Sequence, residues 1–120
     1  MKKVVILACE RIRNQNLCVA CNKCFVAANK LEGEFARHKD EVAILGIMNC
    51  GGCPGNLVVP SLVLLSMQLA SFNEKIDAVH IGTCIMRFCP NKDNIIKIIK
   101  EKAGVEVIEG THTYGKGTIF

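Results

Sequence analysis

The segment VAILGIMNCGGCPG, from Val42 to Gly55, joins a continuous apolar run to a turn that carries two cysteines. The run from Val42 to Ile47 is typical of a strand that is covered on both faces, as the strands of parallel sheets are. The glycines and Pro54 that follow end the strand. The segment therefore predicts a buried parallel strand that delivers Cys50 and Cys53 to one end of a sheet.

The same pattern recurs on both sides of this segment. Further apolar runs predict three more strands, at Val4–Ala8, Ala78–Gly82 and Val105–Ile108. The intervening segments predict three helices, one starting at Asn14 or Asn16 and ending near Gly33, one from Pro60 to Phe72 and one from Lys92 to Ala103. Because strands and helices alternate, we expect right-handed βαβ units. The predicted fold is α/β: a three-layer, doubly wound sheet of about four parallel strands, flavodoxin-like or Rossmann-like.

The composition is that of one folded domain, which we expect to span residues 1–120. Half of the 120 residues are hydrophobic, which excludes a disordered chain. The net charge of +4 is small, and the basic stretch from Lys92 to Lys102 alternates with Ile and Glu, so we expect no nucleic-acid partner. The longest apolar stretch, Leu57 to Phe72, is interrupted by polar residues and falls short of a bilayer, so we expect no membrane partner.

The N-terminal segment MKKVVILACERIR superficially resembles a signal peptide. Its apolar run, Val4–Ala8, is shorter than the hydrophobic region of a signal peptide, and no small-residue cleavage site follows it. We therefore expect a first strand here and a cytoplasmic protein. Disulfides are rare in that compartment, so the 8 cysteines need a reason other than cross-linking.

Cysteine or histidine side chains follow each of the four predicted strands. They are Cys9 after the first strand, Cys50 and Cys53 after the second, Cys84 and Cys89 after the third, and His112 after the fourth. In a parallel sheet the carboxyl ends of all strands lie at one edge, where ligands bind. Cysteines that serve only as small buried hydrophobes would be scattered through strands and helix faces. The placement therefore predicts a shared, thiol-rich site at the C-terminal edge of the sheet.

A run of three cysteines, Cys18, Cys21 and Cys24, adds thiols outside the strand ends. Its C-x-x-C-x-x-C spacing is similar to the start of a bacterial ferredoxin motif, without the fourth Cys-Pro. Within a helix, one or two of these thiols could pack inward; if the run precedes the helix, it could lean over the strand ends and add ligands. His80, inside the third predicted strand, is expected to be a core histidine, and His38 is expected at the surface.

Several segments together resemble those of the CGGC-domain family. NCGGCPG contains the motif that names the family, Cys9 ends the first strand as it does there, and GEFARHKDE, HIGTC, Cys89-Pro90 and EGTH resemble other segments of it. The resemblance covers nearly the whole chain. It implies a small cytoplasmic protein that binds zinc or another metal through cysteines and histidines.

The leading hypothesis is a metal-binding protein with its site at the C-terminal edge of the sheet. The candidate ligands are Cys9, Cys50, Cys53 and Cys84, with His112 as an alternative fourth ligand or an outer partner. Four thiolates suit tetrahedral Zn²⁺, and they suit a 4Fe-4S cluster equally well. Thiolates placed together repel one another unless a cation neutralises them, which favours a metal.

Two alternatives remain open. The cysteines Cys18, Cys21, Cys24 and Cys89 could form a second site. The protein could instead be a thiol–disulfide or persulfide-handling enzyme with Cys50 as the nucleophile and Cys53 as the resolving thiol, because a thiolate both binds metal and attacks disulfides.

The predicted helix from Pro60 to Phe72 is apolar almost all round. A surface helix of so small a domain should have a clearer polar face. We therefore predict that its outer side is buried in a homodimer.

Overall fold

The computed structural model of the chain describes residues 1–113, and residues 114–120 are not described. Four strands form one sheet in the order β2-β1-β3-β4, and each neighbouring pair is parallel. Their bounds are Lys2–Ala8 for β1, Val42–Asn49 for β2, Ala78–Ile81 for β3 and Glu106–Glu109 for β4. The predicted α/β fold with a parallel four-stranded sheet is confirmed.

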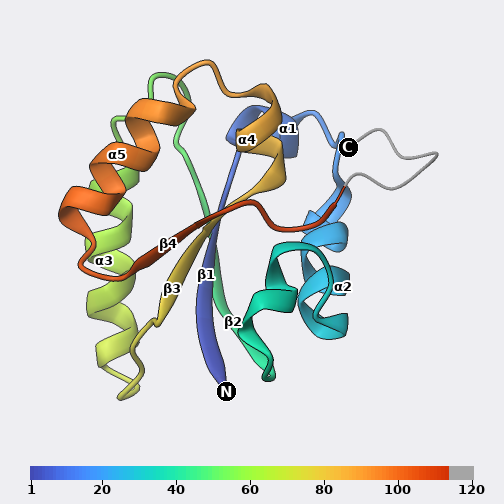
Figure 1. Ribbon diagram of the computed structural model, residues 1–120. Coiled ribbons are helices and arrows are strands. Elements are labelled where there is room, and N and C mark those ends of the chain that lie inside the picture. The colour runs from blue at the N-terminus through green and yellow to red at the C-terminus, as the bar shows by residue number, and fades with distance from the viewer. Residues whose placement is uncertain (114–120) are drawn as a thin grey trace.

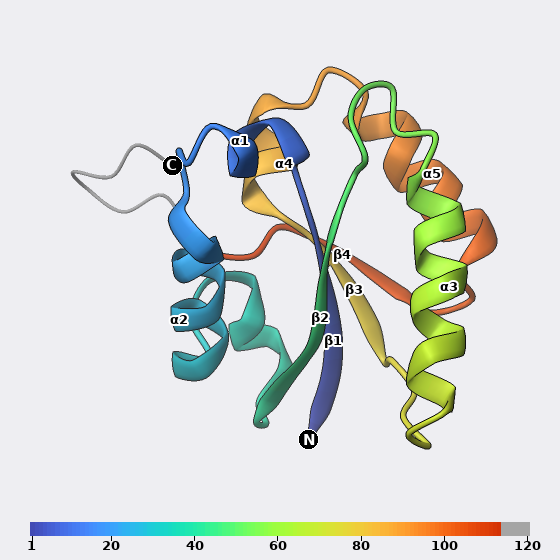
Figure 2. The same cartoon turned by 180° about the vertical axis from the view of Figure 1, so that it is seen from behind.

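Helices cover both faces of the sheet, as Figures 1 and 2 show. The helix α2 (Asn22–Lys30) and the 3-10 segment η2 (Gly33–His38) lie on one face, and α3 (Val58–Ala70) and α5 (Lys92–Lys102) lie on the other. No helix among residues 1–113 is long and apolar enough to cross a membrane.

Strand β1 shows why both faces are covered. Successive side chains of a strand point to opposite faces. Val4 and Ile6 pack in one core cluster with Phe35 of η2, whereas Val5 and Leu7 pack in the other cluster with residues of α3 and α5. All four of these β1 side chains are fully buried. A continuous apolar run is thus required, because neither face of β1 meets water.

The strand order places a switch point between β1 and β3. The chain leaves β1 for β2 on one side and returns to β3 on the other side of β1, as in flavodoxin-like sheets. Ligands of such sheets bind in the crevice beyond the carboxyl ends of the two strands at this point. Two short helices, α1 (Glu10–Asn14) and α4 (Thr83–Phe88), stand above these strand ends at the top of Figure 1.

The first predicted helix is wrong in its extent. In place of one helix from Asn14 or Asn16 to Gly33, the structure has α1, the 3-10 turn η1 (Val19–Cys21) and α2. Three non-glycine residues between α1 and α2 adopt positive φ, namely Asn16, Ala20 and Cys21. That left-handed conformation cannot continue a right-handed helix. Cys18 and Cys21 therefore precede α2, and Cys24 lies in its first turn.

The other elements differ little from the expected ranges. The helix α3 begins at Val58, two residues before Pro60, so the proline lies inside the first turn. The helix α4, which the sequence analysis did not anticipate, begins immediately after β3 and contains Cys84.

Candidate metal centre

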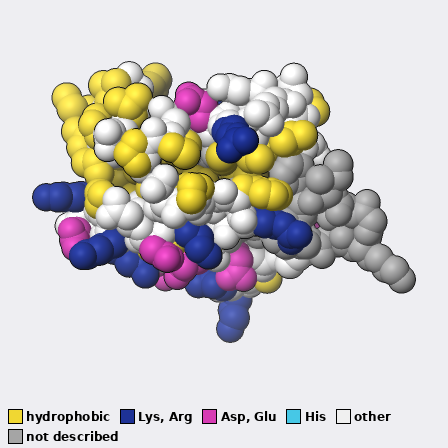
Figure 3. All heavy atoms as spheres, turned by 90° about the horizontal axis from the view of Figure 1, so that it is seen from above, with side chains coloured by type: hydrophobic (Ala, Val, Ile, Leu, Met, Phe, Trp, Pro, Cys, Tyr) yellow, Lys and Arg dark blue, Asp and Glu magenta, His cyan; other side chains and the backbone are white. Residues whose placement is uncertain are grey.

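All eight cysteines are free, and those that follow strands lie at the C-terminal edge of the sheet. Cys9 is the residue after β1, Cys50 is the residue after β2, and Cys84 stands in the first turn of α4. His112 lies three residues beyond the last residue of β4. Figure 3 looks down on this edge. The sheet thus brings together residues that are far apart in the sequence.

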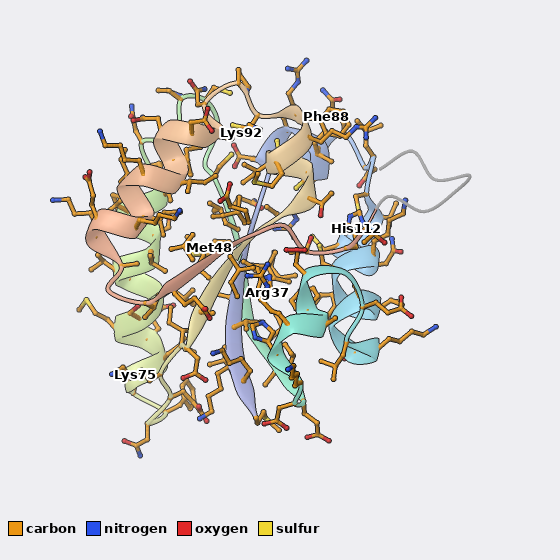
Figure 4. The ribbon with its side chains drawn as sticks, viewed as in Figure 1. Arg37, Met48, Lys75, Phe88, Lys92 and His112 are labelled. Atoms are coloured by element: carbon orange, nitrogen blue, oxygen red, sulfur yellow. The ribbon has the colours of Figure 1, made fainter. Side chains whose placement is uncertain are left out.

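One set of thiols lines a small cavity between the end of β1 and the start of α2. We call it the cavity group; its members are Cys18, Cys21, Cys24 and Cys84. Arg13 and His112 line the same cavity, whose volume is about 10 Å³. That is room for about one water-sized occupant. Figure 4 shows His112 beside the end of α2 that is nearest to α1 and α4.

The remaining thiols lie around the CGGC loop. We call Cys9, Cys50, Cys53 and Cys89 the loop group. Cys9 and Cys50 are buried in one core cluster, and Cys89 packs against that cluster. Burial raises the pKa of Cys89, and negative charge on Cys53, Cys50 or Cys9 raises it further.

The first residues of α1 connect the two groups. The backbone N–H of Cys9 donates to Cys84 Sγ (3.1 Å), and the backbone N–H of Glu10 donates to Cys50 Sγ (3.5 Å). Both donors lie just beyond β1, at the switch point of the sheet. Of the predicted ligands, Cys84 and His112 border the cavity and Cys9, Cys50 and Cys53 do not line it, although Cys84 also packs against the core cluster that contains Cys9 and Cys50.

Two buried threonines hold Cys24 in place. The Thr111 hydroxyl accepts from the Thr83 N–H (3.1 Å) and lies 3.2 Å from Cys24 Sγ. The Thr83 hydroxyl donates to the His112 carbonyl (2.7 Å) and accepts from the Thr111 N–H (3.1 Å). The Thr111 hydroxyl can therefore donate its hydrogen either to the Thr83 hydroxyl or to Cys24 Sγ. A thiolate at Cys24 would be a stronger acceptor than the Thr83 hydroxyl. Sequence reasoning missed both threonines, although each follows a strand within two residues.

Burial disfavours the ionised form of three of the cavity thiols, Cys21, Cys24 and Cys84. Burial raises the pKa of Cys24 to about 11, although the hydrogen bond with Thr111 lowers this pKa. Burial also raises the pKa of Cys84 to about 12, although the hydrogen bond from the Cys9 N–H lowers it. Burial also raises the pKa of Cys21, and the nearby Arg13 lowers it. Metal ligation needs thiolates, so only a strongly charged occupant of the cavity would ionise these groups.

The CGGC loop places its two thiols in different environments. Cys50 is buried, whereas Cys53 is exposed. Gly51 between them has φ of 77°, and a Cβ atom there would lie 2.7 Å from Cβ of Leu57. The position therefore requires glycine on both conformational and steric grounds.

A pair of histidines lies below the thiols. His80 is fully buried, as expected of a core histidine, and its Nδ1 donates to the Gly110 carbonyl (2.9 Å). Its Nε2 lies 2.8 Å from Nε2 of His38. Since His80 is neutral and its Nδ1 carries the hydrogen, its Nε2 accepts from His38. His38, which was expected at the surface, is only partly exposed, because its ring packs edge-on against His80.

The donor chemistry fits a thiophilic metal, but the side chains are not closed around one point. Four thiols and one imidazole border a single cavity. Within residues 1–113, no three Cys, His, Asp or Glu side chains are positioned to hold an ion as they stand. Side chains at the cavity would therefore have to turn toward its centre to hold an ion.

Comparisons with known proteins identify the family of the chain. Residues 3–112 match the family model of the CGGC domain. The uncharacterized protein MJ0582 of Methanocaldococcus jannaschii is 35% identical over 121 residues, which cover 95% of this chain and 89% of that protein. No solved structure gives a significant match to the chain. The matched residues include all eight cysteines and His112. The chain therefore belongs to the CGGC-domain family.

Proposed function

We propose that this protein binds a thiophilic metal through thiolates at the C-terminal edge of its sheet. One observation carries the proposal: free cysteines from separate segments of the chain lie together at this edge, where Cys18, Cys21, Cys24 and Cys84 border one cavity. Cysteines that act only as buried hydrophobes have no reason to gather there. A cation would relieve the repulsion among thiolates placed so close together.

Zn²⁺ is the first candidate and a 4Fe-4S cluster is the second. Both accept four thiolate ligands. The cavity of about 10 Å³ suits a single ion better than a cube of iron and sulfur atoms. His112, which borders the same cavity, is a further candidate ligand or an outer partner.

Metal and sulfide analysis tests this proposal. The protein is purified without oxygen, its visible spectrum is recorded, and zinc, iron and labile sulfide are measured per chain. We expect colourless protein with about one zinc ion per chain. Brown protein with stoichiometric labile sulfide would show that the bound group is an iron–sulfur cluster and not Zn²⁺. Protein that holds no metal and takes none up would refute the proposal.

A thiol–disulfide or persulfide-handling activity is the second candidate function. The observation that favours it is the contrast between the exposed Cys53 and the buried Cys50. Cys53 is the thiol that an external disulfide can reach, and Cys50 is placed to resolve the mixed disulfide. These roles are the reverse of those expected from the sequence, because exposure decides which sulfur is attacked first. Metal-free protein that reduces a small disulfide, with loss of this activity in Cys53→Ser, would favour this function.

We further propose that α3 is the contact surface of a homodimer. Leu64, Met67 and Phe72 are each more than half exposed, at 54%, 65% and 77%. Figure 3 shows hydrophobic side chains gathered on the left, the side on which Figure 1 places α3 and α5. A second copy packed on α3 would remove this surface from water. We also propose that the protein is cytoplasmic, because its eight free thiols are consistent with a reducing compartment.

A further inference from the structure

We infer that the metal ion is held by the cavity group, Cys18, Cys21, Cys24 and Cys84, and that the CGGC motif stands outside its coordination sphere. The inference rests on the proposed function and names the ligands within it. It departs from the set expected from the sequence by exchanging three loop-group cysteines for the C-x-x-C-x-x-C run.

The backbone before α2 wraps the cysteine run around the cavity. Ala20 has φ of 56° and Cys21 has φ of 55°, so the chain turns sharply between Cys18 and Cys24. In an uninterrupted helix the three thiols would lie along one rotating face, too spread to meet. The turn instead brings all three to line one cavity with Cys84, which arrives from β3. Four thiols at one cavity match the number that a structural zinc site uses.

Hydrogen-bonding groups already contact two of these sulfur atoms. Thr111 Oγ1 lies 3.2 Å from Cys24 Sγ, and the Cys9 N–H donates to Cys84 Sγ at 3.1 Å. Donors of this kind orient metal-bound thiolates and stabilise their charge. Thr111 is itself fully buried and held by Thr83 at both its N–H and its hydroxyl. The support for the ligands is therefore rigid, although the thiols themselves must turn to close the site.

A cationic side chain borders the cavity. Four thiolates carry more negative charge than one Zn²⁺ balances, so the loaded site is anionic. The Arg13 guanidinium lines the cavity, and its Nη1 donates to Oδ1 of Asn49 at the end of β2. That hydrogen bond keeps the positive charge beside the thiols. An arginine so placed offsets part of the excess negative charge.

The CGGC loop is less suited to surround an ion. Cys53 is exposed, and the backbone of Gly51 lies directly against Leu57, the residue before α3. The two CGGC thiols would then remain available for reaction while the cavity group holds the metal.

Zn²⁺ binding to matched variants tests the assignment. Zinc affinity is measured by competition with a chromophoric chelator for the wild-type chain, for Cys84→Ser in the cavity group, and for Cys89→Ser in the loop group. Cys84 and Cys89 are both half-buried cysteines near α4, so the two variants are closely matched. We expect Cys84→Ser to weaken binding by more than about 100-fold and Cys89→Ser by less than about threefold. Far-ultraviolet circular dichroism of the metal-free variants checks that both fold.

Alkylation of the wild-type chain gives a readout that does not depend on variant folding. The alkylation rate of each cysteine is measured by mass spectrometry with and without Zn²⁺, so that each thiol is compared with itself and differences in their intrinsic reactivity cancel. We expect Zn²⁺ to slow alkylation of Cys18 and Cys84 and to leave Cys89 and the exposed Cys53 unchanged. Protection of Cys53 and Cys89 instead would overturn this assignment and leave the proposed metal function standing. A chain that takes up neither Zn²⁺ nor a reconstituted cluster would overturn both.

Discussion

Protonation of the buried His80 should make this fold sensitive to acid. The ring is fully buried, stacks on Phe35 with ring centroids 4.3 Å apart, and donates through Nδ1 to the Gly110 carbonyl. A second proton would have to enter at Nε2, which accepts from His38 at 2.8 Å. Burial lowers the pKa of His80 from 6.5 to about 4, and the positive charges of His38 and Arg37 add to this effect.

The size and sign of the effect follow from this pKa. Because the pKa is lower in the folded state, the unfolded chain binds the proton first as the pH falls. The stability that His80 contributes is complete above pH 6.5 and is lost progressively as the pH falls toward about 4. Between about pH 8 and about pH 5 the loss in free energy of unfolding should be about 2 kcal/mol.

Urea unfolding of the wild type and His80→Asn at several pH values measures this loss. The asparagine side chain carries its N–H donor at the place of His80 Nδ1, so it keeps a donor for the Gly110 carbonyl, but it does not titrate. At equal metal content, the wild type should lose about 2 kcal/mol more than the variant between about pH 8 and about pH 5. Equal losses would refute the reasoning. A nuclear magnetic resonance titration in which the His80 ring protonates near its ordinary pKa would refute it independently of the variant.

Three further predictions follow from the site and the surface. Removal of a structural zinc ion with a chelator should lower the melting temperature sharply, because such a site contributes on the order of 10 kcal/mol to folding, and an unchanged melting curve would count against it. Thr111→Val should weaken Zn²⁺ binding by about 10-fold by chelator competition while Thr111→Ser restores it, and equal weakening by both would contradict the positioning role. Met67→Lys on the exposed side of α3 should convert a dimer to a monomer in analytical ultracentrifugation with the melting temperature of the monomer unchanged; a wild-type monomer at micromolar concentration would disprove the dimer.

The strands could be predicted from the sequence because both faces of the sheet are covered. A strand such as β1, buried on both faces, must be a continuous apolar run, and that signal is local. Once the strands are parallel, their carboxyl ends share one edge, so residues such as Cys9, Cys50 and Cys84 were predictable at that edge from their places in the sequence alone.

The grouping of the thiols was decided only by the tertiary structure. Ala20 and Cys21 take left-handed backbone conformations that no local sequence signal requires, since both residues are ordinarily compatible with a helix. Cys21 is buried whereas Ala20 is exposed, and after the turn Cys18, Cys21 and Cys24 line one cavity with Cys84. The sequence therefore determined that this edge of the sheet is rich in thiols. Which thiols share a cavity was decided by how the turn before α2 and the helix α4 pack at this edge, because residues far apart in the sequence meet only in the folded chain.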